Sequence, residues 1–171
     1  MKKFACRAFV LVAGALAVPC AMAAAPTAPK PEDRDVAALR MLWNNYQQAV
    51  ATKDAPALLA MYASGDVPLI GGIAQKSYAV ISAANKQPVP RTISSTAKEN
   101  VTYEVRMPPD QTENLDIHSD GEVGSVSWDY KAKVGHGRII WTTIYTNDGW
   151  KIASVVYSIN VPAADKAAAH G

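Results

Sequence analysis

The most regular pattern in the chain is an alternation of apolar and polar residues toward its C-terminal end. From Ser125 to Val134 the residues alternate between polar ones, which are serine, aspartate or lysine, and apolar ones. This period of two is typical of a strand with one buried and one solvent-facing side. Segments with turn-forming glycines follow at residues 135–137 and 147–149. The pattern predicts three consecutive antiparallel strands over residues 123–159, reversing at those two segments. The histidine of the first segment is then expected at a loop tip.

The first half of the chain has the spacing of helices. Apolar residues recur every three or four positions from Asp33 to Thr52, the period of a long amphipathic helix. Two short helices should follow, one with Asp54 as its N-cap and one over residues 77–85. Pro88 and Pro90 prevent the second of these from continuing.

The segments between these helices and the final strands are predicted to be extended. Residues 67–74 are apolar but contain one proline and two glycines, so they form either an edge strand with a bulge or a loop. Val101–Val105 is the best position for a further strand, and residues 115–118 form a short extended piece. Helices that precede a run of antiparallel strands indicate an α+β fold, in which the helices cover one face of a curved sheet.

The first 23 residues have the features of a secretory signal peptide. They combine basic residues at the start, an apolar run over residues 8–18, and small residues at Ala21 and Ala23. Cys20 could mark a lipid attachment site, but Pro19 does not suit the small residue that such a site needs. The apolar run is shorter than the roughly 20 residues of a membrane-spanning helix. We therefore expect a periplasmic or secreted protein that has no membrane anchor after cleavage.

Removal of this leader changes the composition of the protein. It takes away both cysteines and three of the 17 basic residues, which leaves 14 basic against 15 acidic residues and a net charge of −1. The charge excess of a nucleic-acid-binding protein is therefore absent. The remaining 148 of 171 residues suffice for one domain. We expect a flexible spacer over residues 24–32, the domain over residues 33–161, and a frayed tail over residues 162–171.

Two short motifs give the chain a family resemblance. Tyr46, Asp54 and Tyr62 are separated by seven residues each, and residues 147–152 have the sequence Asn-Asp-Gly-Trp-Lys-Ile. These features resemble the nuclear transport factor 2-like superfamily, which includes ketosteroid isomerase, scytalone dehydratase and the SnoaL-like polyketide cyclases. The resemblance spans about residues 33–159. It implies a cystatin-like fold, in which a cone-shaped antiparallel sheet packs on a long N-terminal helix and two short helices, with a pocket between them and frequent homodimers.

The catalytic residues of these relatives are mostly missing. Tyr46 occupies the place of the oxyanion-hole tyrosine of ketosteroid isomerase, but the two acids of that enzyme would fall near Ile70 and Trp141. The histidines of many SnoaL-like relatives correspond to Ser154 and Val156. None of these four positions can transfer a proton, so an isomerase of that type is disfavoured and we assign no catalytic residue.

Aromatic residues are the candidates for a ligand pocket, because an apolar ring-shaped ligand needs such a lining. The alternative is that these side chains simply fill the core, as large aromatics commonly do. The candidate pocket residues are Trp43, Tyr46, Tyr62, Trp128, Tyr130 and Trp141.

The sequence gives no reason to expect a metal or a cofactor. His118 stands close to Asp116 and Asp120, but the spacing matches no metal motif, and residues in an exposed turn are usually solvated. Asp129 alternates away from Trp128, so it should face solvent or a partner.

Three functions remain open. The first is a non-catalytic exported protein that binds a small apolar molecule or acts as a dimeric accessory domain. The second is an isomerase, dehydratase or cyclase acting on a hydrophobic ring substrate, with Tyr46 as a hydrogen-bond donor. The third is a protein-interaction module that uses the open sheet face. A titratable group of perturbed pKa inside a pocket would favour the enzyme, and a purely apolar cavity would favour binding.

The leader generates a first testable prediction. Mass spectrometry of the exported protein should find a new N-terminus at or next to Ala24, because small residues precede that position. A lipid attached to Cys20 would contradict this prediction.

Overall fold

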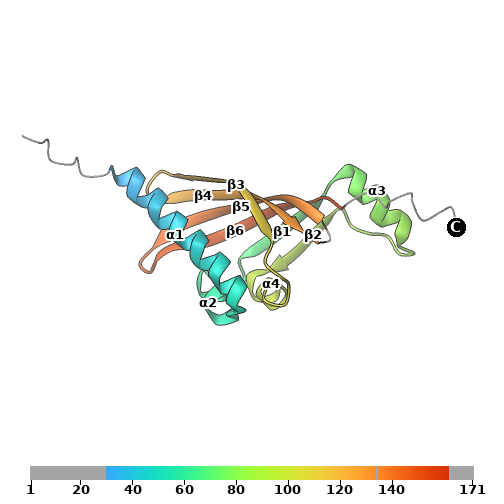
Figure 1. The fold of residues 1–171 in the computed structure, drawn as a ribbon, viewed down its shortest axis with the longest axis horizontal. Coiled ribbons are helices and arrows are strands. Elements are labelled where there is room, and N and C mark those ends of the chain that lie inside the picture. The colour runs from blue at the N-terminus through green and yellow to red at the C-terminus, as the bar shows by residue number, and fades with distance from the viewer. Residues whose placement is uncertain (1–29, 134, 162–171) are drawn as a thin grey trace, which may run out of the picture.

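The computed structural model describes residues 30–133 and 135–161, which form four helices and six strands (Figure 1). In chain order these are α1 (Pro31–Thr52), α2 (Ala55–Ala60), β1 (Pro68–Ile73), α3 (Gln75–Ala84), β2 (Thr92–Thr96), α4 (Ala97–Glu104), β3 (Gln111–Ser119), β4 (Val123–Ala132), β5 (Gly135–Thr146) and β6 (Gly149–Ile159).

The six strands form one sheet in the order β2-β1-β6-β5-β4-β3. All neighbouring strands are antiparallel except β1 and β6, which are parallel. Helix α1 lies along one face of this sheet and contacts β3, β4 and β6 (Figure 1). The predicted α+β class is therefore confirmed, although the sheet is mixed and not purely antiparallel.

The predicted helices are present, with small shifts at their ends. Helix α1 begins at Pro31 and not at residue 33, because proline is tolerated in a first turn and the acidic residues that follow suit the positive end of the helix dipole. Asp54 caps α2 as predicted, since its Oδ1 accepts a hydrogen bond of 3.0 Å from the Ala57 N–H. Helix α3 covers the third predicted segment but begins two residues earlier, at Gln75.

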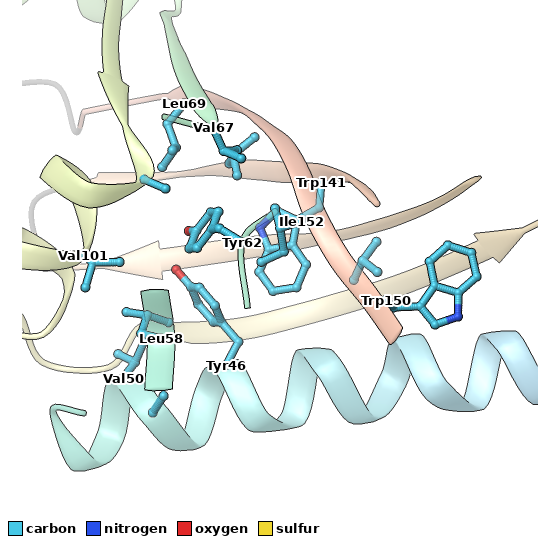
Figure 2. Close-up of a cluster of buried hydrophobic side chains, with 14 of the residues drawn as sticks. Tyr46, Val50, Leu58, Tyr62, Val67, Leu69, Val101, Trp141, Trp150 and Ile152 are labelled. Carbon is cyan, nitrogen blue, oxygen red and sulfur yellow. The ribbon is translucent and has the colours of Figure 1, made fainter. Parts of the chain in front are cut away.

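The core lies between α1 and the sheet. Leu39, Tyr46, Ala49 and Val50 form the buried side of α1, and they face strand residues that include Trp128, Trp141 and Ile152. Figure 2 shows Tyr46 rising from α1 toward Tyr62, with Trp141 and Ile152 beside them. The helical period of α1 and the alternation of the strands thus supply the two sides of one core, as predicted.

The strand predicted at Val101–Val105 is wrong, because these residues belong to α4 and its C-cap. The strand of this region is β2, which ends where α4 begins. Thr96 and Glu99 form a capping box: the Thr96 hydroxyl accepts from the Glu99 N–H, and the Glu99 carboxylate accepts from the Thr96 N–H. This cap, together with burial of Ala97 and Val101 on one helical face, overrides the strand preference of the β-branched residues. The domain therefore has three short helices and not two.

The Gly-His-Gly reversal predicted at residues 135–137 is also wrong. Gly135 pairs with Ala132 and His136 pairs with Lys131, so the chain reverses before Gly135. His136 lies within β5 and also bridges to Asn160. Here glycine allows two strands to approach each other closely, since a Cβ on Gly137 would collide with the Ser158 carbonyl oxygen.

Residues 68–73 form a strand, but not an edge strand. β1 lies between β2 and β6, and its pairing with β6 matches Leu69 to Val155. Gly71 is needed there because a Cβ would lie 2.6 Å from the ring of Tyr157. Gly71, one of the two glycines that suggested a loop, thus allows a side chain of β6 to lie across the neighbouring strand.

The predicted signal peptide, residues 24–29 of the predicted spacer and the predicted frayed tail lie outside the described residues. None of the helices in the described part of the chain is both long and apolar enough to cross a membrane.

Burial of Trp150 at the start of β6 generates the second prediction. Its ring is 7% exposed and packs edge-on against Tyr145 at a centroid distance of 5.5 Å. Trp150→Ala should therefore destabilise the protein by about 3 to 5 kcal/mol, measured by urea unfolding. Tyr103→Ala removes an aromatic ring that is 67% exposed, and this control should change stability by less than about 0.5 kcal/mol. Equal effects of the two substitutions would contradict the burial of Trp150.

Candidate functional site

A cavity of about 170 Å³ lies at the margin of the core, where α1, α4 and the sheet meet. Its wall combines apolar, hydroxyl and carboxyl groups. The residues that line it are Tyr46, Tyr62, Leu69, Asn100, Glu104, Asp110, Tyr130, Ile139, Trp141, Val155 and Tyr157. Such a mixture of apolar surface with a few convergent polar groups is typical of a small-molecule site.

Two tyrosines form the polar side of the cavity next to the core. Tyr46 stands on α1, and Tyr62 follows α2, where a parallel bridge to Ile152 of β6 fixes its position. Figure 2 shows that both hydroxyl oxygens point toward the side where Val101 of α4 lies. Burial is the main cause that raises the pKa of each phenol, and the nearby Glu104 raises both further. Both tyrosines therefore stay protonated near neutral pH and can act as hydrogen-bond donors.

Glu104 brings a carboxyl group to these hydroxyls. It is the last residue of α4, and the capping box at the other end of this helix fixes where α4 begins. Burial raises the pKa of Glu104, and a hydrogen bond from Tyr46 opposes the rise. Repulsion from Asp110 raises this pKa further, and a hydrogen bond from Asn100 lowers it. The negative end of the α4 dipole further disfavours the ionised form of this carboxyl group.

Asp110 is the second acid of the cavity. It follows Pro108 and Pro109, in the connection between α4 and β3, and burial raises its pKa. Among the described residues that line the cavity, none is a lysine, arginine or histidine. The two carboxyl groups thus share one site without a cationic partner in its wall, an arrangement that favours holding at least one proton.

The structure brings four of the six predicted pocket residues to this cavity: Tyr46, Tyr62, Tyr130 and Trp141. Trp43 and Trp128 are not in its wall but pack against the same cluster, with ring centroids 6.2 Å apart. Trp128 is 2% exposed and also packs edge-on against Trp141 at 4.7 Å. The pocket and the core are therefore continuous, and Tyr46 and Trp141 belong to both.

The acids of the site were missed by sequence reasoning. A strand at Val101–Val105 gives no reason to place Glu104 in a pocket, whereas α4 places it one turn after the buried Val101. The signal that could have revealed this is the spacing of Thr96 and Glu99, which is the sequence signature of a capping box.

The other polar residues considered from the sequence lie elsewhere. His118 contacts Asp116 at 3.1 Å, but both side chains are more than half exposed. Asp129 pairs with Arg138 at 2.9 Å, and both line a second hollow of about 660 Å³, which shares Tyr130 with the cavity. The described residues contain no cluster of three or more histidine, cysteine, aspartate or glutamate side chains that could hold a metal ion.

Comparison of the chain with models of protein families and with curated proteins found no match. Solved structures are similar in fold at low sequence identity. An NTF2-like protein of unknown function from Shewanella baltica matches with a TM-score of 0.57 and 10% identity, over 77% of this chain and 97% of that one. An NTF2-like protein of unknown function from Silicibacter pomeroyi matches with a TM-score of 0.56 and 16% identity, over 75% and 98%.

A third similar structure is a proposed dehydratase of the NTF2-like family from Streptomyces avermitilis. It matches with a TM-score of 0.50 and 14% identity, over 77% of this chain and 99% of that one. The matched regions span most of the domain and nearly the whole of these three proteins. The chain therefore has the nuclear transport factor 2-like, or NTF2-like, fold.

Proposed function

We propose that this protein is an enzyme that transfers a proton on a small, largely apolar molecule carrying a carbonyl-type oxygen, in an isomerisation or a dehydration. The observation that supports this proposal is the carboxyl group of Glu104 in an aromatic cavity beside the Tyr46 hydroxyl, with burial raising its pKa. A titratable group of perturbed pKa in a cleft is the feature that separates a proton-transfer site from a simple apolar pocket.

The carboxyl group and the tyrosine hydroxyls of the cavity have complementary roles in such a reaction. An ionised Glu104 accepts a proton from the carbon next to the substrate carbonyl, and its raised pKa makes it a stronger base than an ordinary glutamate. The Tyr62 hydroxyl donates a hydrogen bond to the oxygen on which negative charge develops, and the Tyr46 hydroxyl turns from Glu104 to the same oxygen once Glu104 has taken the proton. The protonated Glu104 then returns this proton to another carbon or to a departing hydroxyl group, which restores the ionised carboxylate. The first outcome is an isomerisation and the second is a dehydration.

The volume of the cavity suits a small substrate. A volume of about 170 Å³ is close to the roughly 150 Å³ of an apolar protein cavity that holds benzene. Leu69, Ile139 and Val155 supply apolar surface for such a ring. A molecule with one ring fits inside this volume.

The similar solved structures are consistent with this proposal but are not evidence for a particular reaction. The proposed dehydratase from Streptomyces avermitilis has the same fold, and fold alone does not specify a reaction. The non-catalytic reading rested on the lack of acids at Ile70 and Trp141, whereas Glu104 approaches the cavity from a different element. Binding without catalysis is therefore the second candidate, since the same groups could hold a ligand oxygen.

Export and dimerisation remain proposals as well. The leader supports export. For a homodimer, the sheet face opposite the core offers an exposed row formed by Ile70, Val156 and Ile140, which lie side by side on β1, β6 and β5. An apolar row across three strands is a suitable core for an interface.

The third prediction tests proton transfer directly. The wild-type protein should accelerate the exchange of hydrogen for deuterium next to the carbonyl of one-ring cyclic ketones, followed by proton NMR in heavy water. Glu104→Gln should lower the rate by about 10² to 10⁴-fold, because it removes the base. Tyr46→Phe should lower it by about 10² to 10³-fold, because it removes a donor to the developing charge.

Glu122→Gln is the matched control, since Glu122 is exposed and remote from the cavity wall, and it should leave the rate unchanged. Equal exchange rates for the wild type and Glu104→Gln would contradict the assigned base. Tryptophan emission that responds to the ketones without any accelerated exchange would favour binding without catalysis.

The fourth prediction concerns stability and pH. Burial raises the pKa of Glu104 in the folded protein, so the folded state holds this proton more tightly than the unfolded chain. Stability from this group is therefore complete below the ordinary glutamate pKa and is lost as the pH rises through the raised folded value. Glu104→Gln cannot ionise, so it should be more stable than the wild type at about pH 7.5, and the difference should shrink at about pH 4, measured by urea unfolding.

Glu122→Gln again serves as the control and should follow the wild type at both pH values. A Glu104→Gln protein that is less stable than the wild type at the higher pH would show that the ionised carboxylate stabilises the fold.

A further inference from the structure

The two edges of the sheet differ in their protection against further strands. β3 forms one edge, and it carries Glu113, Asp116 and His118, a register shift between Glu113 and Asp116, and Asn114 at a positive φ of 53°. Charges and bulges of this kind prevent another strand from pairing. β2 forms the other edge with the sequence Thr-Ile-Ser-Ser-Thr, which has neither charge nor proline.

The register of β2 identifies its unpaired backbone groups. Hydrogen bonds of 2.9 Å from the Ile73 N–H to the Arg91 carbonyl, and from the Ala97 N–H to the Val67 carbonyl, lie at the two ends of the β1–β2 pair. Because hydrogen-bonded pairs alternate along an antiparallel ladder, Ile93 and Ser95 bond to β1. The backbone groups of the intervening residues Thr92, Ser94 and Thr96 then point away from the sheet.

The backbone groups of Thr96 are already used. The Thr96 N–H donates to the Glu99 carboxylate at 2.9 Å. The Thr96 carbonyl belongs to the N-cap of α4, where it accepts the first hydrogen bond of the helix. The N–H and carbonyl groups of Thr92 and Ser94 have no strand partner within the described part of the chain. This is the hydrogen-bonding pattern that an added strand of about five residues satisfies.

An open groove of about 520 Å³ runs beside this edge, between β2 and α4. Ile93 is 44% exposed and Tyr103 is 67% exposed, and both are in its wall. A strand paired with β2 would direct alternate side chains into this groove, where the two residues offer apolar contact.

The charged residues of the groove indicate which charge a partner should carry. Arg106 lines the groove and forms no ion pair with the described residues. Glu99 lines it as well, but its carboxylate lies at the N-terminus of α4, where the capping hydrogen bond and the positive end of the helix dipole offset its charge. Two copies of this chain joined through the same edge would bring their Arg106 charges into one interface. An acidic partner is therefore favoured over a second copy.

We propose that β2 is a docking edge for an extended, acidic segment of a partner polypeptide. The segment adds a seventh strand to the sheet by bonding to Thr92 and Ser94, rests an apolar side chain on Ile93 and Tyr103, and directs a carboxylate to Arg106. This proposal is independent of the proton-transfer function, because the groove and the cavity have no residue in common.

The fifth prediction tests this edge with random 12-residue peptides displayed on phage and selected on the purified protein. The enriched peptides should be acidic, and the most enriched one is synthesised with a fluorescent label for anisotropy titrations. Ser94→Pro removes one outward N–H at an edge position that tolerates proline, so it should weaken binding on the order of tenfold or more. Ser94→Thr keeps the N–H and should bind like the wild type.

Two further measurements separate strand addition from general adhesion. Arg106→Glu should weaken binding of the acidic peptide, whereas Arg40→Glu, on the exposed side of α1, should not. Amide hydrogen exchange at Thr92 and Ser94 should slow when the peptide binds. Unchanged emission of the buried tryptophans in Ser94→Pro checks that the fold is retained.

Several results would overturn the proposal. They are the absence of any enriched peptide, binding that survives Ser94→Pro, and equal losses for Ser94→Pro and Ser94→Thr. A concentration-dependent dimer that Ser94→Pro abolishes would assign the edge to a second copy of the chain.

Discussion

The packing of α1 against Trp128 and Trp141 of the sheet is the contact on which the rest of the domain depends. Tyr46 meets Trp141 edge-on at 4.8 Å, and Trp141 meets Trp128 in the same way. Gly124 lets the helix approach this closely, because a Cβ there would lie 2.7 Å from a methyl group of Leu39. Since the ring of Tyr46 is held in this contact, its hydroxyl is fixed at the edge of the core, where the cavity begins.

The cavity is a place where the stability of the fold and the proposed proton transfer have opposite requirements. A core of this composition is most stable when every buried group is apolar or fully hydrogen-bonded. Glu104 departs from that rule at the C-terminal end of a helix, close to a second carboxyl group. Local departures from folding rules are expected at functional positions, and the remainder of the core supplies the stability that such a departure consumes.

Elements with a clear period could be predicted from the sequence. The helix that contains Tyr46 and the strands that contain Trp128 and Trp141 follow their hydrophobic patterns, and so their burial was foreseeable. The short helices α2 and α3 were also predicted, but the short extended segments were not, because five or six residues with β-branched side chains fit both a helix and a strand. The segment Val101–Val105 had the largest effect on the prediction. A strand there gives no reason to place Glu104 at the candidate site, whereas a helix does. The Gly-His-Gly segment failed for another reason: glycine permits close backbone approach as well as turns, and only tertiary contacts with Ser158 distinguish the two.

The parallel pairing of β1 with β6 has a consequence for the order in which the protein folds. Leu69 joins Val155, and Tyr62 is bridged to Ile152, so two residues of the cavity wall from the first half of the chain are held by its last strand. Contacts between such distant parts of a chain form slowly and require the whole sequence to be present. The helix and the hairpins can assemble earlier from local contacts, but the cavity closes only when β6 is in place. A chain that lacks β6 can therefore retain much of its secondary structure and yet lack this cavity.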